Sequence, residues 1–177
     1  MSEAPRVYVD TCGFVNLVKT EVGHSLNSDK EADAWYLKRL LEANRDGEVE
    51  VFTSTLTIAE STHVGLTPVP GRVQHHFNRL LMSGQYVKLV QLSPFVASDA
   101  RDLRWKHNIN LKGADAAHLA SAISMNCQEF ITTNGRFTRI EEHHAALSKL
   151  GLEPIESRNT KLIPSKYLQL RLDDQSD

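Results

Sequence analysis

The chain has 177 residues, the length of one domain, and its 41 % hydrophobic content is enough to form a buried core. Its net charge of −2 gives no basic signature of a nucleic-acid-binding protein, although metal-bridged binding of phosphate groups does not require a basic chain. Two cysteines are too few for a disulfide framework, the start MSEAPRVYVD lacks an apolar signal core, and no apolar run approaches the ~18 residues of a membrane span, so we expect a cytoplasmic protein without membrane association.

Short β-rich runs alternate with helical patterns in the first part of the chain. Residues 6–10 (RVYVD) have the composition of a strand that ends on a carboxylate, and Thr11 follows as a candidate N-cap of a helix. In residues 31–44, apolar residues recur at the spacing i, i+3, i+6 and i+7, which indicates an amphipathic helix. The predicted elements here are strands at 6–10 and 48–53 and helices at 13–19, 31–44 and 55–64.

The same alternation continues to residue 155, and it predicts an α/β fold with a parallel sheet in a single domain spanning 1–177. A helix is expected to begin after Gly113. Residues 157–172 show no clear period, and the acidic end at 173–177 predicts a frayed tail. The other predicted elements are a loop at 65–71, helices at 72–83, 94–107 and 141–150, and strands at 86–92, 129–133 and 152–155.

Four oxygen-bearing side chains are expected at one edge of this sheet. Asp10 and Asn134 each follow a strand, Asp115 opens a helix, and Glu60 lies on the helix after the second strand. In open α/β sheets, sites form outside the carboxyl ends of the strands. Three carboxylates there would repel one another, and a hard cation such as Mg²⁺ or Mn²⁺ would relieve that repulsion. The pattern indicates a metal site that hydrolyses a phosphodiester.

Each of these residues also has a purely structural interpretation. Asp10 could cap the helix that follows it, and Glu60 could form a capping box with Thr57. Asp115 could be a favourable charge in the first turn of a helix, and Asn134 precedes a glycine as turn residues often do. Spacing alone leaves both interpretations open.

Four segments of the sequence resemble the PIN-domain family. They are VYVDTCGFVNL around Asp10, STLTIAES around Glu60, and the pair LKGADAAHLASA and FITTNGRF, which contains Asp115 and Asn134. Their order and spacing agree with the family over about Arg6–Ile155. Within the family, the sequence is most similar to the VapC-type ribonuclease toxins of type II toxin–antitoxin systems.

This resemblance implies a three-layer α/β/α fold and a Mg²⁺- or Mn²⁺-dependent endoribonuclease that cleaves single-stranded RNA. It also implies a homodimer and a cognate antitoxin that blocks the cleft. Asp10, Glu60 and Asp115 match the acidic positions of the family, and Asn134 stands at the strand-end position. The resemblance therefore implies catalytic and metal-binding roles for these residues.

Two positions depart from the family pattern. Asn134 stands where Asp is usual, which lowers the negative charge of the site, although an amide oxygen can still bind water or an ion. Cys12 stands where Asn or Ser is common, and we interpret it as a small filler. His118 is expected at the edge of the cleft, where it could also steady Asp115 or touch substrate, and Thr133 could bond a ligand water. Basic residues that could contact RNA phosphates are Arg101, Arg104, Lys106, Lys112 and Arg136.

Two other functions remain open at the level of sequence. One is an RNA-processing nuclease of the same fold that has no antitoxin. The other is a non-catalytic module for binding nucleic acid or a partner, with Asn134 as a sign of lost activity. A test for metal-dependent cleavage would separate the two nuclease functions, the toxin and the RNA-processing enzyme, from the non-catalytic module.

Overall fold

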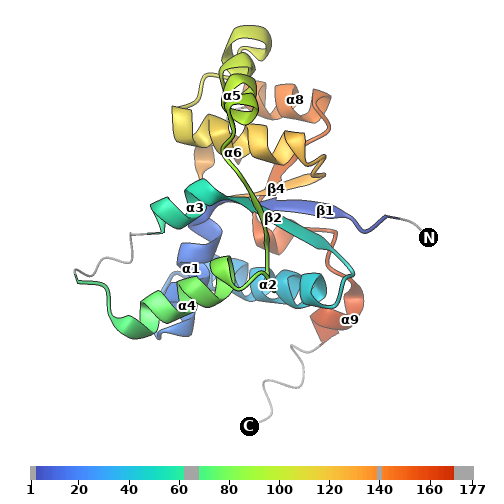
Figure 1. Cartoon of the computed structure of the whole chain (residues 1–177). Coiled ribbons are helices and arrows are strands. Elements are labelled where there is room, and N and C mark those ends of the chain that lie inside the picture. Colours follow the sequence, from blue (N-terminus) through green and yellow to red (C-terminus); the bar gives the residue numbers. More distant parts are fainter. Residues whose placement is uncertain (1–2, 62–67, 139–140, 170–177) are drawn as a thin grey trace.

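A five-stranded parallel sheet forms the centre of the molecule (Figure 1). The structure is a computed structural model, and it describes residues 3–61, 68–138 and 141–169. The strand order is β3-β2-β1-β4-β5, and all four strand pairs are parallel. The strands are β1 (Arg6–Val9), β2 (Glu50–Ser54), β3 (Lys88–Val90), β4 (Glu129–Ile131) and β5 (Glu153–Ile155).

The central strand β1 is buried on both faces, as expected of a parallel sheet covered on both sides by helices. Val7 and Val9 belong to one hydrophobic core, whereas Tyr8 belongs to the other. Tyr8 stacks on Phe130 of the neighbouring β4, with ring centroids 5.4 Å apart. The alternation of side chains along a strand therefore divides β1 between two cores.

One face of the sheet is covered by α1 (Thr11–Glu21), α2 (Ser28–Arg45), α4 (Gly71–Met82) and α9 (Ser165–Leu168). Helix α1 lies close to both β1 and α2 because residue 13 is a glycine. A Cβ atom there would lie 3.0 Å from Val9 Cγ1 and 3.3 Å from Leu37 Cδ2. This close approach fixes the direction in which α1 leaves the sheet, directly after Asp10.

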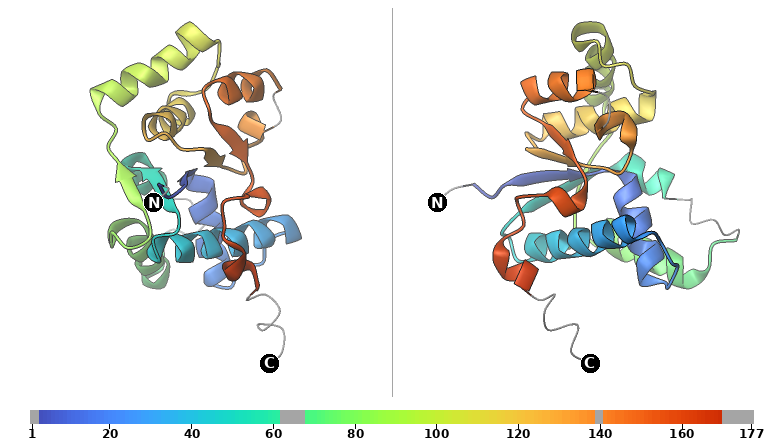
Figure 2. Two further views of the ribbon diagram at one scale, coloured as in Figure 1. Left: turned by 90° about the vertical axis from the view of Figure 1, so that its right-hand side faces the viewer. Right: turned by 180° about the vertical axis from the view of Figure 1, so that it is seen from behind.

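The opposite face is covered by α5 (Pro94–His107), α6 (Gly113–Ser124) and α8 (Glu141–Lys149), and Figure 2 shows these layers from two further sides. The small side chains of α6, including Ala116, Ala117 and Ala120, are buried and let the helix approach its neighbours. The three-layer α/β/α architecture with a central parallel sheet is confirmed.

The remaining described elements are short. They are α3 (Thr55–Glu60), α7 (Gly135–Thr138) and the 3-10 turn η1 (Ser157–Asn159). The sequence predicted neither α7 nor the helical turns after residue 157, because elements this short show no hydrophobic period. The end of the predicted helix 55–64, part of the loop 65–71 and the tail 173–177 lie outside the described residues. No helix of the described part of the chain has the length and apolar character needed to cross a membrane.

Candidate active site

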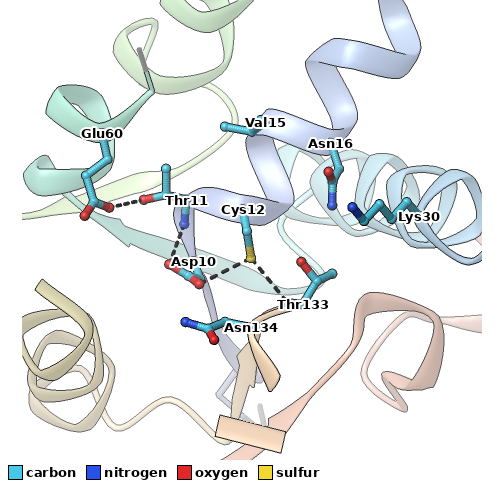
Figure 3. A pocket seen from close by; sticks show the side chains of 9 residues that line it. All are labelled: Asp10, Thr11, Cys12, Val15, Asn16, Lys30, Glu60, Thr133 and Asn134. Atoms are coloured by element: carbon cyan, nitrogen blue, oxygen red, sulfur yellow. Dashed lines mark hydrogen bonds between the residues drawn. The ribbon is translucent and has the colours of Figure 1, made fainter. Parts of the chain in front are cut away.

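A pocket opens where the carboxyl ends of β1 and β4 meet. The chain runs from β1 to β2 on one side and returns on the other side as β4, so the strand order reverses at this point. Ligands of open α/β sheets bind at such a switch point. The pocket has a volume of about 710 Å³ (Figure 3). It is lined by Asp10, Thr11, Cys12, Val15, Asn16, Lys30, Glu60, Thr133 and Asn134.

Asp10 follows β1 directly and is held by three donors. Its Oδ1 accepts a hydrogen bond from the Thr11 backbone N–H at 2.7 Å, and its Oδ2 accepts from Thr132 Oγ1 at 2.8 Å and from Cys12 Sγ at 3.2 Å. The residue is the N-cap of α1, so the prediction of Thr11 as the cap was wrong and the capping role of Asp10 is confirmed. Capping needs only the backbone donor, and the two side-chain donors additionally fix the orientation of the carboxylate.

Glu60, the last residue of α3, contacts both α1 and α6. Its Oε2 accepts hydrogen bonds from Thr11 Oγ1 at 2.6 Å and from His118 Nε2 at 2.8 Å. Burial disfavours the charged form of Glu60, but these two hydrogen bonds outweigh burial and lower its pKa. The capping box with Thr57 is wrong, because Ser54 caps α3.

His118 of α6 is only 2 % exposed and connects Glu60 to the central strand. Its Nδ1 lies 2.8 Å from the Tyr8 hydroxyl, and its Nε2 lies 3.8 Å from Asp10 Oδ1. Because an ionised Glu60 can only accept, His118 Nε2 donates the hydrogen bond between them. Burial raises the pKa of Tyr8, which therefore keeps its proton. His118 is buried next to the pocket, where it bonds Glu60, and it is also one of the groups that lower the pKa of Asp115.

Asp115 lies in the first turn of α6, as predicted. Its Oδ2 is 3.5 Å from Arg136 Nη1. Burial and, next, the negative charge of Asp10 raise the pKa of Asp115, and Arg136 offsets these effects only in part. Asp115 is not among the residues that line the pocket, but its carboxylate is within electrostatic reach of Asp10.

Asn134 follows β4 and begins the turn into α7. Its Oδ1 accepts a hydrogen bond from the Arg136 backbone N–H at 3.1 Å, and its own backbone N–H donates to Thr132 Oγ1 at 3.0 Å. The turn role is thus confirmed. Asn134 also lines the pocket, and Figure 3 shows its side chain close to Asp10. Its structural role and a role in the pocket are compatible.

Cys12 packs between the two strand ends. Its Sγ donates to Asp10 and accepts from the Thr133 backbone N–H at 3.2 Å. Burial, followed by the charge of Asp10, raises the pKa of Cys12 to about 12, so the protonated thiol persists. This agrees with the interpretation of Cys12 as a filler. Thr133 contributes a backbone donor to this contact.

The acidic side chains at the switch point offer oxygen ligands, which suit a hard divalent cation. Within residues 3–61, 68–138 and 141–169, no three His, Cys, Asp or Glu side chains lie close enough together to hold an ion by themselves. Magnesium keeps several waters and is often bound by only one or two carboxylates. Asp10 and Asp115 could hold such a hydrated ion, and its charge would offset the repulsion that raises the pKa of Asp115.

The structure brings further residues to the site for which the sequence suggested no role there. Thr11 and Thr132 orient the carboxylates, and Asn16 and Lys30 line the far part of the pocket. A polar Asn inside the apolar run GFVNLV was a signal for Asn16. Nothing in the sequence marks Tyr8, because its bond to His118 spans 110 residues.

Comparison with known proteins gives one family and one fold. A search of curated proteins found no match. The structure is similar to a chain from the crystal structure of VapBC2 from Rickettsia felis bound to a DNA fragment from their promoter, with a TM-score of 0.55 and 16 % sequence identity over 84 % of this chain and 98 % of that chain. At this identity the likeness shows the fold alone. Residues 7–143 match the PIN domain family, and this range includes the carboxyl ends of β1 and β4 and the acidic residues described above. The chain belongs to the PIN domain family.

Proposed function

We propose that this protein is a divalent-metal-dependent endoribonuclease that cleaves single-stranded RNA and acts as the toxin of a type II toxin–antitoxin pair. PIN domains are generally nucleases, and the family match supports the reaction class. The observation that carries the proposal is the pocket at the switch point, which Asp10, Glu60 and Asn134 line together; the raised pKa of Asp115, caused by burial and by the charge of Asp10, adds support. Two carboxylates kept within electrostatic reach of each other across a switch point are a site prepared for a cation.

The donor set supports a hydrated Mg²⁺ or Mn²⁺ ion. Asp10 and Asp115 would hold it, and Glu60 and Asn134 would bind through its waters. Such an ion, when bound, polarises a phosphoryl oxygen and lowers the pKa of water. Asp10 is already oriented for this role by Thr132 and by the N-terminus of α1.

The protein's own groups would position the attacking water and the substrate. Glu60 is held by Thr11 and His118 and stays ionised, so one of its oxygens can accept a proton or orient water. The Asn134 amide can hold a water or a substrate oxygen, since its Oδ1 has a second lone pair beside the bond from Arg136. Attack on phosphorus would leave a 5′-phosphate, as the family resemblance implies.

The assignment as a toxin predicts a protein partner. An antitoxin would place an Arg or a C-terminal segment into the acidic part of the pocket, because a guanidinium pairs well with carboxylates. We also propose a homodimer. The assignment as a toxin is supported by the fold shared with a chain of VapBC2 and by the presence of Asp10 and Glu60 in one pocket.

The enzymatic proposal is tested on purified protein with an RNA pool in Mg²⁺, in Mn²⁺ and in EDTA. Cleavage should require a divalent ion and should be lost in Asp10→Asn and Asp115→Asn, which remove charge with little change of shape. Asp99→Asn is the matched control, because Asp99 is exposed on α5. Cleavage that persists in EDTA and in both site variants would show that these acids only cap helices.

The toxin assignment needs a separate experiment. Expression of the protein alone should slow growth, and co-expression with the product of the neighbouring gene should restore growth and yield a co-purifying complex. A protein that cleaves RNA but has neither toxicity nor such a partner would be an RNA-processing nuclease. A protein without metal-dependent cleavage would be the non-catalytic module.

A further inference from the structure

The pocket extends beyond the acidic residues to a polar region that the proposed reaction does not use. This region contains Asn16 of α1 and Lys30 from the first turn of α2. In Figure 3, the Lys30 side chain reaches toward Asn16, and both lie on the side of Asp10 away from Glu60. One pocket thus has an acidic part and a part with the opposite charge.

Asn16 has an unusual environment for a polar residue. The residue is 8 % exposed, and within the described part of the chain its side-chain amide makes no hydrogen bond to protein groups, so the amide is open to the pocket. Because the residue lines the pocket, a ligand can supply the missing partner.

Lys30 provides the charge of this region. Among the described residues that line the pocket, it is the one cation. Within residues 3–61, 68–138 and 141–169, its Nζ forms no ion pair and no hydrogen bond, while its backbone N–H donates to Asn27 Oδ1 at 3.0 Å. The side-chain carboxylates of the pocket, those of Asp10 and Glu60, are instead bonded to hydroxyls, a thiol and His118.

From these features we propose that Asn16 and Lys30 form a subsite for the phosphodiester next to the scissile one, with the Lys30 ammonium as the counter-charge and the Asn16 amide N–H as a hydrogen-bond donor. Lysine binds phosphate as a point charge, and Asn side chains commonly donate to phosphate oxygens. The scissile phosphate would lie over Asp10, and the pocket of about 710 Å³ falls within the range of about 300–1,000 Å³ typical of ligand sites. The inference rests on the proposed function, since it names how the same site holds its substrate.

The test compares Lys30→Gln with the matched control Lys149→Gln, an exposed lysine of α8. The KM for a single-stranded RNA oligonucleotide is measured over a range of salt concentrations. Lys30→Gln should raise KM more than it lowers kcat and should reduce the slope of log(1/KM) against log[salt] by about 0.7, the contribution of one phosphate contact in a single strand. Lys30→Arg should keep the slope, and Asn16→Asp should raise KM by repelling the phosphate.

A modified substrate sharpens the assignment. An oligonucleotide with one neutral methylphosphonate next to the cleavage site should have a higher KM for the wild type but not for Lys30→Gln, because the two changes remove the same contact. Equal slopes for Lys30→Gln and Lys149→Gln would overturn the subsite. So would a Lys30→Gln protein that keeps its RNA affinity but loses its antitoxin, since Lys30 would then bind a protein carboxylate.

Failure of the subsite can be told apart from failure of the nuclease proposal. The same salt series is run as equilibrium binding of fluorescent RNA to Asp10→Asn protein with and without Lys30→Gln. Wild-type cleavage with no Lys30 effect in either assay overturns the subsite and leaves the nuclease. Binding that depends on Lys30 without wild-type cleavage supports the subsite and overturns the nuclease, and absence of both binding and cleavage overturns both.

Discussion

Glu60 and Asp115 are carboxylates of one candidate site, but their surroundings shift their pKa values in opposite directions. Glu60 accepts two short hydrogen bonds, from Thr11 and His118, which outweigh burial and lower its pKa. The pKa of Asp115 is raised by burial and by the charge of Asp10. The contact of Asp115 with Arg136 is longer, at 3.5 Å. The protein's own groups therefore stabilise the ionised form of Glu60, whereas they do not fully stabilise the ionised form of Asp115.

This difference separates two tasks within the site. A carboxylate that already accepts hydrogen bonds from the protein is positioned and ionised before any ligand arrives, which suits a group that orients water. A carboxylate under repulsion gains most when a cation binds, because the ion removes an unfavourable interaction as well as forming a favourable one. We therefore propose that Glu60 positions water and that Asp115 binds the ion.

The largest effect is expected for Asp115→Asn. Loss of a residue that only supports metal ligands costs about 10–100-fold in activity or affinity, so loss of a direct ligand should lower kcat/KM by more than about 100-fold. Purified variants are compared on one RNA oligonucleotide at saturating Mg²⁺. A smaller loss than for Glu60→Gln would reverse the assignment of the two tasks.

His118→Leu should give the next largest effect, because His118 holds Glu60 in place. Cleavage should fall by about 10–100-fold, mainly in kcat. Stability should also fall by about 1–3 kcal/mol, since Tyr8 and Glu60 lose a buried partner. His75→Leu on the exposed side of α4 is the matched control for cleavage and urea unfolding. If KM rose while kcat stayed the same, His118 would not act through Glu60.

Asn134→Asp should strengthen metal binding, and its effect should be smaller than those of the two preceding variants. A further carboxylate near Asp10 should lower the Mg²⁺ concentration for half-maximal cleavage by up to about tenfold, the lower end of the range for residues outside the direct ligand shell. The new side chain can still accept the bond from the Arg136 N–H. An unchanged metal titration would reduce Asn134 to a turn residue.

The smallest effects are expected in the stability of the metal-free protein. The raised pKa of Asp115 means that its ionised form destabilises the fold, so Asp115→Asn should raise the free energy of unfolding at pH 7, and this gain should vanish below the ordinary pKa of 3.8. The lowered pKa of Glu60 has the opposite effect on the free energy of unfolding. Ionised Glu60 stabilises the fold above the ordinary pKa of 4.5, and this contribution is lost as pH falls through the pKa of Glu60 in the folded protein.

Urea unfolding in EDTA across this pH range measures both contributions. Glu60→Gln should lower stability at pH 7 by about 1 kcal/mol, the usual size of a net hydrogen bond, and the difference should shrink in acid. Changes of the same sign in the two variants would remove the contrast between the two carboxylates.

The sequence predicted much of the fold because its elements alternate clearly. Helix α5 was predicted with its observed bounds, and each strand was found within a few residues. The ends of elements were less certain: the cap of α1 is Asp10, because its carboxylate reaches the Thr11 N–H. The order of the strands depends on contacts between distant segments, which periodicity does not contain.

The site was predicted as a set of acids at strand ends, whereas their supporting contacts were not. Spacing placed His118 on the face of Asp115, but in the fold it binds Glu60 and Tyr8, which are 58 and 110 residues away in sequence. His143 is buried, with Nδ1 at 3.3 Å from the Arg136 carbonyl, and no periodicity marks this contact. Such pairs follow from how α6 and α8 dock on the sheet.

The pKa of Asp115, measured by carbon NMR titration in EDTA and again in Mg²⁺, tests most directly the claim that this site is built around a cation. We predict a pKa above the ordinary value of 3.8 without metal and a clear fall when Mg²⁺ binds, with Glu60 already below 4.5 in EDTA. An Asp115 pKa that Mg²⁺ leaves unchanged, in protein that nevertheless cleaves RNA, would contradict the account.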